Sequence, residues 1–278
     1  MQTIDPQARV TSPVRWAGGK RWLIPTLRAL VSGIEVGKYH EPFLGGASVF
    51  LGLPSFSWAY LSDANAELIE TFTTIRDHPK RVADQVFEYS NDEPTYYEVR
   101  ASSPSGKIAQ AARFLYLNHT SFNGVYRVNL EGVYNVPYGR GRVARIPTAD
   151  QLREVAARLK YASLRIRDFE ACLSQVSAGD LVFLDPPYTV AHNNNGFIKY
   201  NQRLFSFEDQ GRLSTVVDEI KDRGAYYILA NAAHESIAVL FDKGDTLIET
   251  SRRNSIGGTN ARRGGAVEYL FTNLPERD

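Results

Sequence analysis

The 278-residue sequence contains a single cysteine, Cys172. One cysteine excludes an internal disulfide framework and any zinc site built from several cysteines, and the histidines show no metal-ligand spacing. Long apolar runs are also missing. No stretch approaches the roughly 20 residues that a membrane-spanning helix needs, and the N-terminal stretch lacks the apolar core of a signal peptide. We therefore expect a cytoplasmic protein that uses no metal.

An excess of charge of one sign is missing as well, because 32 Lys and Arg stand against 31 Asp and Glu, a net charge of +1. The charges are nevertheless unevenly distributed. Residues 113–167 contain ten basic and three acidic residues, and residues 251–265 contain four arginines and no acid. These segments carry +7 and +4, so the rest of the chain carries −10. The alternative is that Arg153, Arg158 and Lys160 form the solvated face of a helix, but the overall distribution favours a DNA partner.

The pattern of apolar residues indicates an α/β fold. Short buried runs, typical of strands, alternate with segments of helical spacing. We expect strands near residues 39–44, 58–61, 164–166, 181–184, 226–230 and 266–272, and helices near 22–31, 47–51, 66–76, 108–118, 148–159 and 207–223. Repeated strand–turn–helix units predict a layered sheet. The middle of the chain is helical, basic and rich in Asn, Gly and Tyr, so we place an inserted domain at 70–163 within a main domain of 1–69 and 164–278.

The sharpest motif is Asp185-Pro186-Pro187-Tyr188, directly after the apolar run 181–184. The two prolines fix the backbone at a φ of about −65°. The Asp185 carboxylate and an adjacent backbone carbonyl can together accept both hydrogens of one exocyclic amino group, and the Tyr188 ring can stack on the base that carries it. This combination suits a nucleobase brought out of its helix. The alternative is an ordinary strand-to-loop turn, in which Asp caps and Pro stiffens the chain.

A second motif runs from Glu41 to Gly45-Gly46 at the end of a predicted strand, where glycines let a ligand approach the backbone. Asp63 ends the next strand, at the usual distance between a glycine-rich turn and an acid that binds ribose hydroxyls. Because the full G-x-G-x-x-G is absent, a nucleoside-type cofactor fits better than a dinucleotide, and a Rossmann-type oxidoreductase is disfavoured. The Gly18-Gly19-Lys20 turn lacks the spacing of a phosphate loop, which disfavours phosphoryl transfer.

These stretches together resemble the Dam-like (D12 class) family of DNA adenine-N6 methyltransferases. The matching segments occur in the family's order over nearly the whole chain: WAGGK at 16–20, EPFLGG at 41–46, SDAN at 62–65, the segment 114–139, FLDPPY at 183–188 and the segment 252–270. The resemblance implies a Rossmann-like sheet of the S-adenosylmethionine-dependent type, with an inserted, mainly helical DNA-recognition domain. It also implies double-stranded DNA as the partner.

The resemblance assigns roles to residues on the cofactor side. Trp16 and Lys20 should line the S-adenosylmethionine pocket, with Phe43 packed near it. Asp63 should bind the ribose hydroxyls, and Asp168 and Phe169 should hold the adenine. Asp185 would serve twice, near the cofactor's amino group and on the target N6, with Pro186, Pro187 and Tyr188 completing the catalytic motif. For Trp16 and Phe43 the alternative is core packing.

On the DNA side, residues 120–145 resemble the family's DNA-reading hairpin and loop. Phe122 would wedge into the vacated base stack beside Asn123. Arg127 is the candidate for a bidentate guanine contact, and Val125 for contact with a thymine methyl. Further candidates for contacts with bases or phosphates are Arg15, Arg140, Arg252, Arg253, Arg262 and Arg263. For any single arginine the alternative is a solvated surface charge.

The hairpin departs from the family at His119-Thr120-Ser121 and at Phe122, where Tyr is common, so the target sequence is less defined than the reaction. The reading residues resemble those of GATC-specific members, and GATC is our expected target. A relaxed or different adenine context, a same-fold enzyme acting on RNA or on cytosine N4, and a non-catalytic DNA-binding module remain alternatives. Asp185, in place of Ser or Asn, favours adenine. We expect a monomer, with more than one copy able to bind one DNA.

Overall fold

The computed structural model describes residues 10–129, 131–140, 145–189, 205–252 and 266–275. Seven strands form one mixed sheet in the order β3-β2-β1-β4-β5-β7-β6. Their bounds are β1 Tyr39–Glu41, β2 Ala59–Asp63, β3 Ala162–Ile166, β4 Leu181–Leu184, β5 Tyr226–Ala232, β6 Thr246–Arg252 and β7 Ala266–Thr272. The order 3-2-1-4-5 is that of a doubly wound, Rossmann-like sheet. The predicted α/β class is confirmed.

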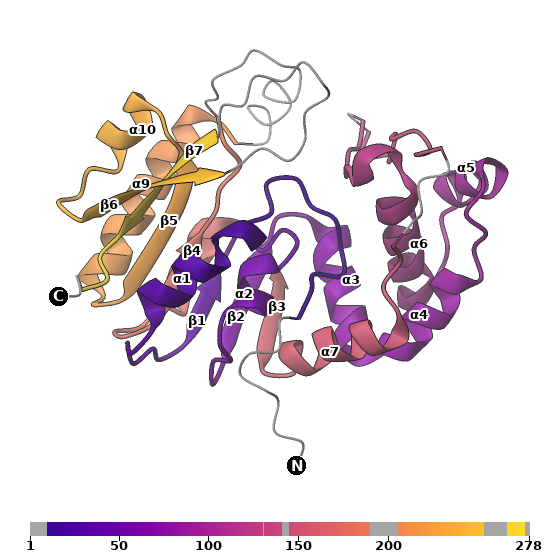
Figure 1. Cartoon of the computed structure of the whole chain (residues 1–278), viewed down its shortest axis with the longest axis horizontal. Helices are drawn as coiled ribbons and strands as arrows, with labels where there is room; N and C mark the ends of the chain where they lie inside the picture. The colour runs from indigo at the N-terminus through magenta and orange to yellow at the C-terminus, as the bar shows by residue number, and fades with distance from the viewer. Residues whose placement is uncertain (1–9, 130, 141–144, 190–204, 253–265, 276–278) are drawn as a thin grey trace. The chain divides into compact units, whose positions relative to one another are not determined.

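The helices alternate with these strands along the chain (Figure 1). The α-helices of the described residues are α1 Ile24–Val31, α2 Ser48–Gly52, α3 Ala66–Asp77, α4 Pro79–Phe87, α5 Glu93–Ala101, α6 Lys107–Thr120, α7 Ala149–Leu159, α9 Phe207–Asp222 and α10 Glu235–Leu240. Short 3-10 turns are η1 Arg21–Leu23, η2 Phe122–Gly124 and η3 Phe169–Ser174. In the part of the chain that the structure describes, no helix combines the length and apolar character needed to cross a membrane.

The chain forms two compact units. Unit 1 contains Met1–Ile24, Leu44–Ser55 and Ser62–Ile166, and unit 2 contains Pro25–Phe43, Phe56–Leu61 and Arg167–Asp278. These boundaries differ from the predicted division into a main domain of 1–69 and 164–278 and an inserted domain of 70–163. That division separates regions by their expected function, and it stays a prediction.

Unit 2 holds most of the sheet. β4 pairs in parallel with β1 and with β5, while β7 runs antiparallel to both β5 and β6. One face of these strands packs on α9 in a core that includes Val182, Leu229 and Phe271 from the sheet and Leu213 and Val217 from the helix. Because β4 is buried along its whole length, the residue that follows it is delivered from a rigid support.

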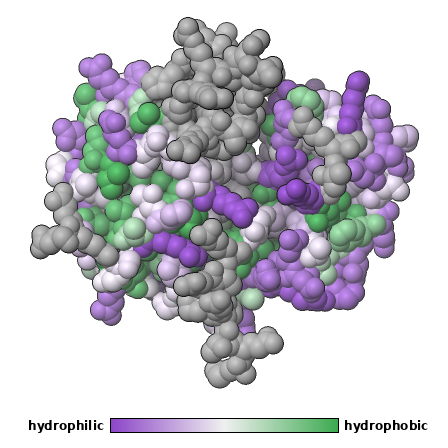
Figure 2. Space-filling view, viewed as in Figure 1, coloured by the Kyte–Doolittle hydropathy of each residue, from purple (hydrophilic) through white to green (hydrophobic). Residues whose placement is uncertain are grey.

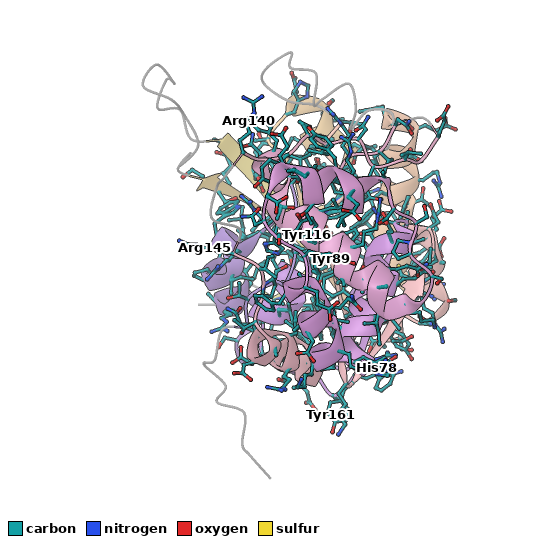
Figure 3. All side chains as sticks on the ribbon, turned by 90° about the vertical axis from the view of Figure 1, so that its right-hand side faces the viewer. His78, Tyr89, Tyr116, Arg140, Arg145 and Tyr161 are labelled. Atoms are coloured by element: carbon teal, nitrogen blue, oxygen red, sulfur yellow. The ribbon has the colours of Figure 1, made fainter. Side chains whose placement is uncertain are left out.

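Unit 1 holds the helical middle of the chain. Helices α3 and α4 both pack against α6 and α7. Pro79 opens α4 directly after α3 ends, because proline is tolerated in the first turn of a helix. Tyr89 and Tyr116 (Figure 3) lie 5.1 Å apart between ring centroids in this helical core. Figure 2 shows hydrophilic side chains over much of the solvent-facing surface of these helices.

Candidate active site and DNA interface

The strand order reverses its direction between β1 and β4, the place where doubly wound sheets bind ligands at the carboxyl ends of their strands. The parallel register pairs Tyr39 with Leu181 and His40 with Val182. Asp185 directly follows β4, and Phe43 lies two residues after the end of β1. Two residues predicted for the site therefore follow neighbouring strands at the same edge of the sheet.

The loop 185–189 begins where β4 ends. Asp185 and Tyr188 are half-buried, and Pro186 is buried between them. The Tyr188 hydroxyl donates a hydrogen bond of 2.8 Å to a carboxylate oxygen of Glu268 on β7. The aromatic side chain of the motif is therefore held at its hydroxyl end, with a half-buried carboxylate three residues before it.

An aromatic cluster lies in unit 2 beyond the end of β1. The Phe43 ring stacks on Phe169 at 5.2 Å between centroids and meets the edge of Phe205 at 5.6 Å. Asp168 caps the turn that carries Phe169, because its Oδ1 accepts a hydrogen bond from the Glu170 amide. The structure thus brings Phe43 together with Phe169, two residues assigned to the cofactor.

Arg212 of α9 holds the segment 168–170 in place. Its guanidinium donates to the carboxylates of Asp168 at 2.9 Å and Glu170 at 2.8 Å, and it lies 4.7 Å from the centre of the Phe169 ring. The Arg212 hydrogen bond lowers the pKa of Glu170, so this carboxylate stays ionised. Sequence reasoning missed Arg212, because it lies 44 positions from Asp168.

In unit 1, Asp63 shapes the glycine turn. One carboxylate oxygen accepts from the Gly45 amide and the other from the Asn65 amide, each at 2.9 Å. Burial raises the pKa of Asp63, and the hydrogen bonds from Asn65, Gly45 and Ala64 oppose that rise. Gly45 has a φ of +47°, a conformation that favours glycine. Each carboxylate oxygen keeps acceptor capacity for a further donor, such as a hydroxyl.

Trp16 lies against the same turn. A Cβ on Gly45 would lie 2.8 Å from Trp16 Cδ1, so only glycine admits the indole at this distance. Trp16 also stacks on Tyr126, with ring centroids 5.6 Å apart. Lys20 is buried, and its ammonium donates to the Gly18 carbonyl at 2.9 Å. These contacts show that Trp16 packs against its neighbours, and its role in the cofactor pocket stays a prediction.

The segment that starts at Thr120 forms the predicted hairpin. Antiparallel bridges join Ser121 to Tyr138 and Val128 to Tyr134, and the Phe122 amide donates to the Pro137 carbonyl at 2.9 Å. Phe122 is 52% exposed, so its ring is accessible to a DNA duplex, although Phe87 and Phe207 are exposed to a similar degree. Asn123 beside it adopts a left-handed φ of +57°. Val125 is half-buried.

The basic residues of this region differ in their surroundings. Arg127 is exposed, and its Nε donates to Asn135 Oδ1 at 2.8 Å. Arg140 and Arg145 are exposed, and their side chains point away from the ribbon (Figure 3). In contrast, Arg113 and Arg158 donate to backbone carbonyls inside unit 1, so part of the basic segment 113–167 is structural.

Arg15 is fixed to α6 through its backbone. Its amide donates to Asn118 Oδ1 at 2.7 Å, and its carbonyl accepts from Asn118 Nδ2 at 2.8 Å. Its side chain lies against Gly124, which has a φ of +63°. Asn118 is buried, and sequence reasoning missed it, although an Asn within an apolar helix is a signal for such a role.

The second basic segment lies largely outside the described residues. Arg252 ends β6, while Arg253, Arg262 and Arg263 fall outside the described ranges. Among the residues that the structure describes, no three His, Cys, Asp or Glu side chains form a group that could hold a metal ion.

The chain is similar in sequence to known DNA methyltransferases. A model of the D12 class N6 adenine-specific DNA methyltransferase family matches residues 16–256. The chain is 31% identical over 270 residues to the Type II methyltransferase M1.LlaDCHI of Lactococcus lactis subsp. cremoris, covering 93% of this chain and 94% of that protein. It is 30% identical over 283 residues to the Type II methyltransferase M.MjaIII of Methanocaldococcus jannaschii, covering 94% and 98%. It is 29% identical over 224 residues to the DNA adenine methylase of Escherichia coli K12, covering 78% and 79%.

Proposed function

The chain belongs to the D12 class of N6 adenine-specific DNA methyltransferases, and from this membership we propose that the loop 185–188 holds one flipped adenine of double-stranded DNA during methyl transfer. One observation carries the proposal. Asp185 directly follows β4 at the reversal of the strand order, where β4 pairs with β1. A ligand bound there meets the carboxylate, the proline carbonyl and the tyrosine ring from one short loop.

The chemistry follows from the acceptors in this loop. An adenine N6 is a poor nucleophile, because its lone pair is delocalised into the ring. When the Asp185 carboxylate and the Pro186 carbonyl accept both N6 hydrogens, the nitrogen would become pyramidal and its lone pair would be available for a new bond to the methyl carbon. The carbon–sulfur bond of the donor would break, and the surplus N6 proton would pass to the Asp185 carboxylate. Tyr188 stacks on the base and fixes its plane. Catalysis is then mostly positioning and electrostatics.

The methyl donor of the proposal is S-adenosylmethionine, which supplies a methyl group on a positively charged sulfur. Unit 1 offers residues that fit it. The Asp63 carboxylate can accept from ribose hydroxyls in addition to its backbone donors. The further proposed cofactor residues are Trp16 and Lys20 in unit 1 and Phe43, Asp168 and Phe169 in unit 2. Asp185 of unit 2 would also accept from the donor's amino group.

The hairpin is the proposed reader of the DNA. Phe122 would fill the space left by the flipped adenine, and Arg127 would contact guanine in the major groove. Asn123 and Val125 lie beside them, and Arg15, Arg140, Arg252, Arg253, Arg262 and Arg263 would contact bases or phosphates. The target of the proposal is GATC, and a cytoplasmic site of action follows from DNA as the substrate.

Methyl transfer from labelled S-adenosylmethionine to a panel of duplexes tests the proposal. The panel contains a GATC duplex, duplexes with one base pair changed, the GATC site as duplex RNA, and a duplex without adenine. We expect label on the GATC duplex alone. Equal label on all adenine-containing duplexes would overturn the sequence assignment. Label on the RNA or on the adenine-free duplex would support the RNA or cytosine-N4 alternative.

A further inference from the structure

Two consecutive residues after the catalytic carboxylate are anchored by different parts of unit 2. The first is Tyr188, whose hydroxyl donates to Glu268 on β7 at 2.8 Å. Glu268 is only 8% exposed, so its carboxylate is held largely away from water. A hydrogen bond to a charged acceptor in such surroundings is stronger than one at the surface.

The second anchored residue is Thr189. Its Oγ1 accepts a hydrogen bond of 2.9 Å from Gln210 Nε2 on α9. Gln210 Oε1 in turn accepts from Asn231 Nδ2 on β5 at 3.0 Å. Gln210 and Asn231 are fully buried and Thr189 is 4% exposed. A buried polar group that loses its hydrogen-bond partner destabilises the protein, so the three side chains fix one another's positions.

The two anchors lie on opposite faces of the sheet. The antiparallel register of β5 and β7 pairs Asn231 with Tyr269 and Ala232 with Glu268. Directly paired residues point to the same face and successive residues to opposite faces. Asn231 faces α9, whose Gln210 it contacts, so Glu268 faces the other side. The loop is therefore held from both faces at adjacent residues.

We propose that Glu268 and Gln210 are positioning residues that hold Tyr188 and Thr189 from the two faces of the sheet and so fix the geometry of the catalytic loop. This inference rests on the proposed role of Tyr188 at the target base. A tether at the hydroxyl holds the long axis of the ring, because rotation about the Cα–Cβ bond would carry the oxygen away from Glu268. The position of the ring on which the base stacks is therefore set before DNA binds. Loss of either anchor lowers the fraction of bound adenine held in the reactive geometry.

A double-mutant cycle tests the Glu268 arm. Glu268→Leu and Tyr188→Phe each remove one partner, and Glu268→Gln keeps an acceptor. We expect the single-turnover rate to fall roughly tenfold in each of the first two variants, with no further fall in the double variant. Glu268→Gln should stay within about threefold of the wild-type rate, and the KM for S-adenosylmethionine should change little in all of them. Glu249→Leu, an exposed glutamate on the neighbouring strand β6, is the matched control.

A second cycle tests the Gln210 arm with Thr189→Val and Gln210→Leu, whose effects on the rate should likewise not multiply. Urea unfolding of every variant identifies any that fails to fold. If Glu268→Leu or Gln210→Leu fails, the milder substitutions Glu268→Gln and Thr189→Val still test the corresponding interaction. The inference would be overturned if the rate losses of the two single variants multiplied in either double variant. A wild-type rate in folded Glu268→Leu and Gln210→Leu would also overturn it. If the wild-type protein itself transfers no methyl group to adenine, the proposed function fails instead, so the two failures are distinguishable.

Discussion

The indole of Trp16 stacks on the phenol ring of Tyr126, with centroids 5.6 Å apart and planes inclined by 26°. Trp16 touches the glycine turn at Gly45, and Tyr126 directly precedes Arg127 in the hairpin. The Tyr126 hydroxyl also donates to Glu67 at 2.8 Å, which fixes its ring from α3. One aromatic pair therefore joins the turn proposed to bind the cofactor to the hairpin proposed to read DNA.

Gly45→Ala should weaken S-adenosylmethionine binding at least tenfold, because the new methyl group would displace Trp16. The positive φ adds a backbone cost of about 1–2 kcal/mol. Isothermal titration calorimetry measures the binding. Gly179→Ala is the matched control, since Gly179 has a φ of +78° but no atom within 4 Å of the added Cβ. Equal affinity in the two variants would contradict the role of the turn.

Tyr126→Leu should reduce S-adenosylmethionine affinity although Tyr126 is not proposed to touch the cofactor. A stacked pair contributes about 0.5–1.5 kcal/mol beyond its buried area, and its loss frees the Trp16 ring. Tyr126→Phe keeps the ring and should bind the cofactor like the wild type. The same titration would contradict the link if Tyr126→Leu bound as tightly as Tyr126→Phe.

Arg127→Ala should relax sequence choice, because a bidentate contact with guanine contributes about 1–3 kcal/mol of discrimination. Methylation rates on duplexes that differ at one base pair measure the change. Asn135→Ala should have a smaller effect in the same direction, since Asn135 orients the Arg127 guanidinium. Arg81→Ala, an exposed arginine on α4, is the control. A uniform loss of rate across all duplexes would instead make Arg127 a phosphate contact.

Stability should fall in mild acid because of buried histidine. Burial lowers the pKa of His40, against the opposing effect of Asp180 at 2.9 Å, and burial also lowers the pKa of His119. Both side chains therefore take up protons more readily in the unfolded chain, where a histidine pKa is about 6.5. The stability that the two neutral histidines contribute is complete above that pH and is lost as the pH falls below it.

Urea unfolding between pH 7.5 and 5.5 measures this dependence. The raised pKa of Asp63 acts in the opposite direction but is common to all variants, so the comparison with His40→Gln isolates the histidine. We expect a shallower fall in His40→Gln than in the wild type, and an unchanged fall in the exposed control His78→Gln. Parallel curves for His40→Gln and the wild type would contradict the account.

Much of the sheet could be predicted from the sequence, because a continuous apolar run defines a buried strand. The run 181–184 matches β4 and 266–272 matches β7, while β5 extends two residues past its predicted end. The strand β6 was missed, although its residues alternate, because it is an edge strand with few apolar side chains. The sequence predicts one helix near 66–76 and none directly after it, whereas Pro79 begins the further helix α4.

The candidate site could be predicted only in part. Asp185, Gly45 and Asp63 belong to local motifs at strand ends, so the sequence indicates them directly. Their supports come from far along the chain: Glu268 lies 80 positions from Tyr188, and Asn118 lies 103 positions from Arg15. Such contacts depend on the order and register of strands and helices, which no local pattern specifies.

Nucleoside analysis of DNA from a host that lacks adenine methylation tests the central claim most directly. The host expresses either the wild-type chain or Asp185→Ala, and mass spectrometry quantifies N6-methyladenine and N4-methylcytosine in its DNA. The account predicts N6-methyladenine with the wild-type chain and none with Asp185→Ala, which should fold normally because the residue is a half-buried loop side chain. N4-methylcytosine in place of N6-methyladenine, or equal N6-methyladenine from both chains, would contradict it.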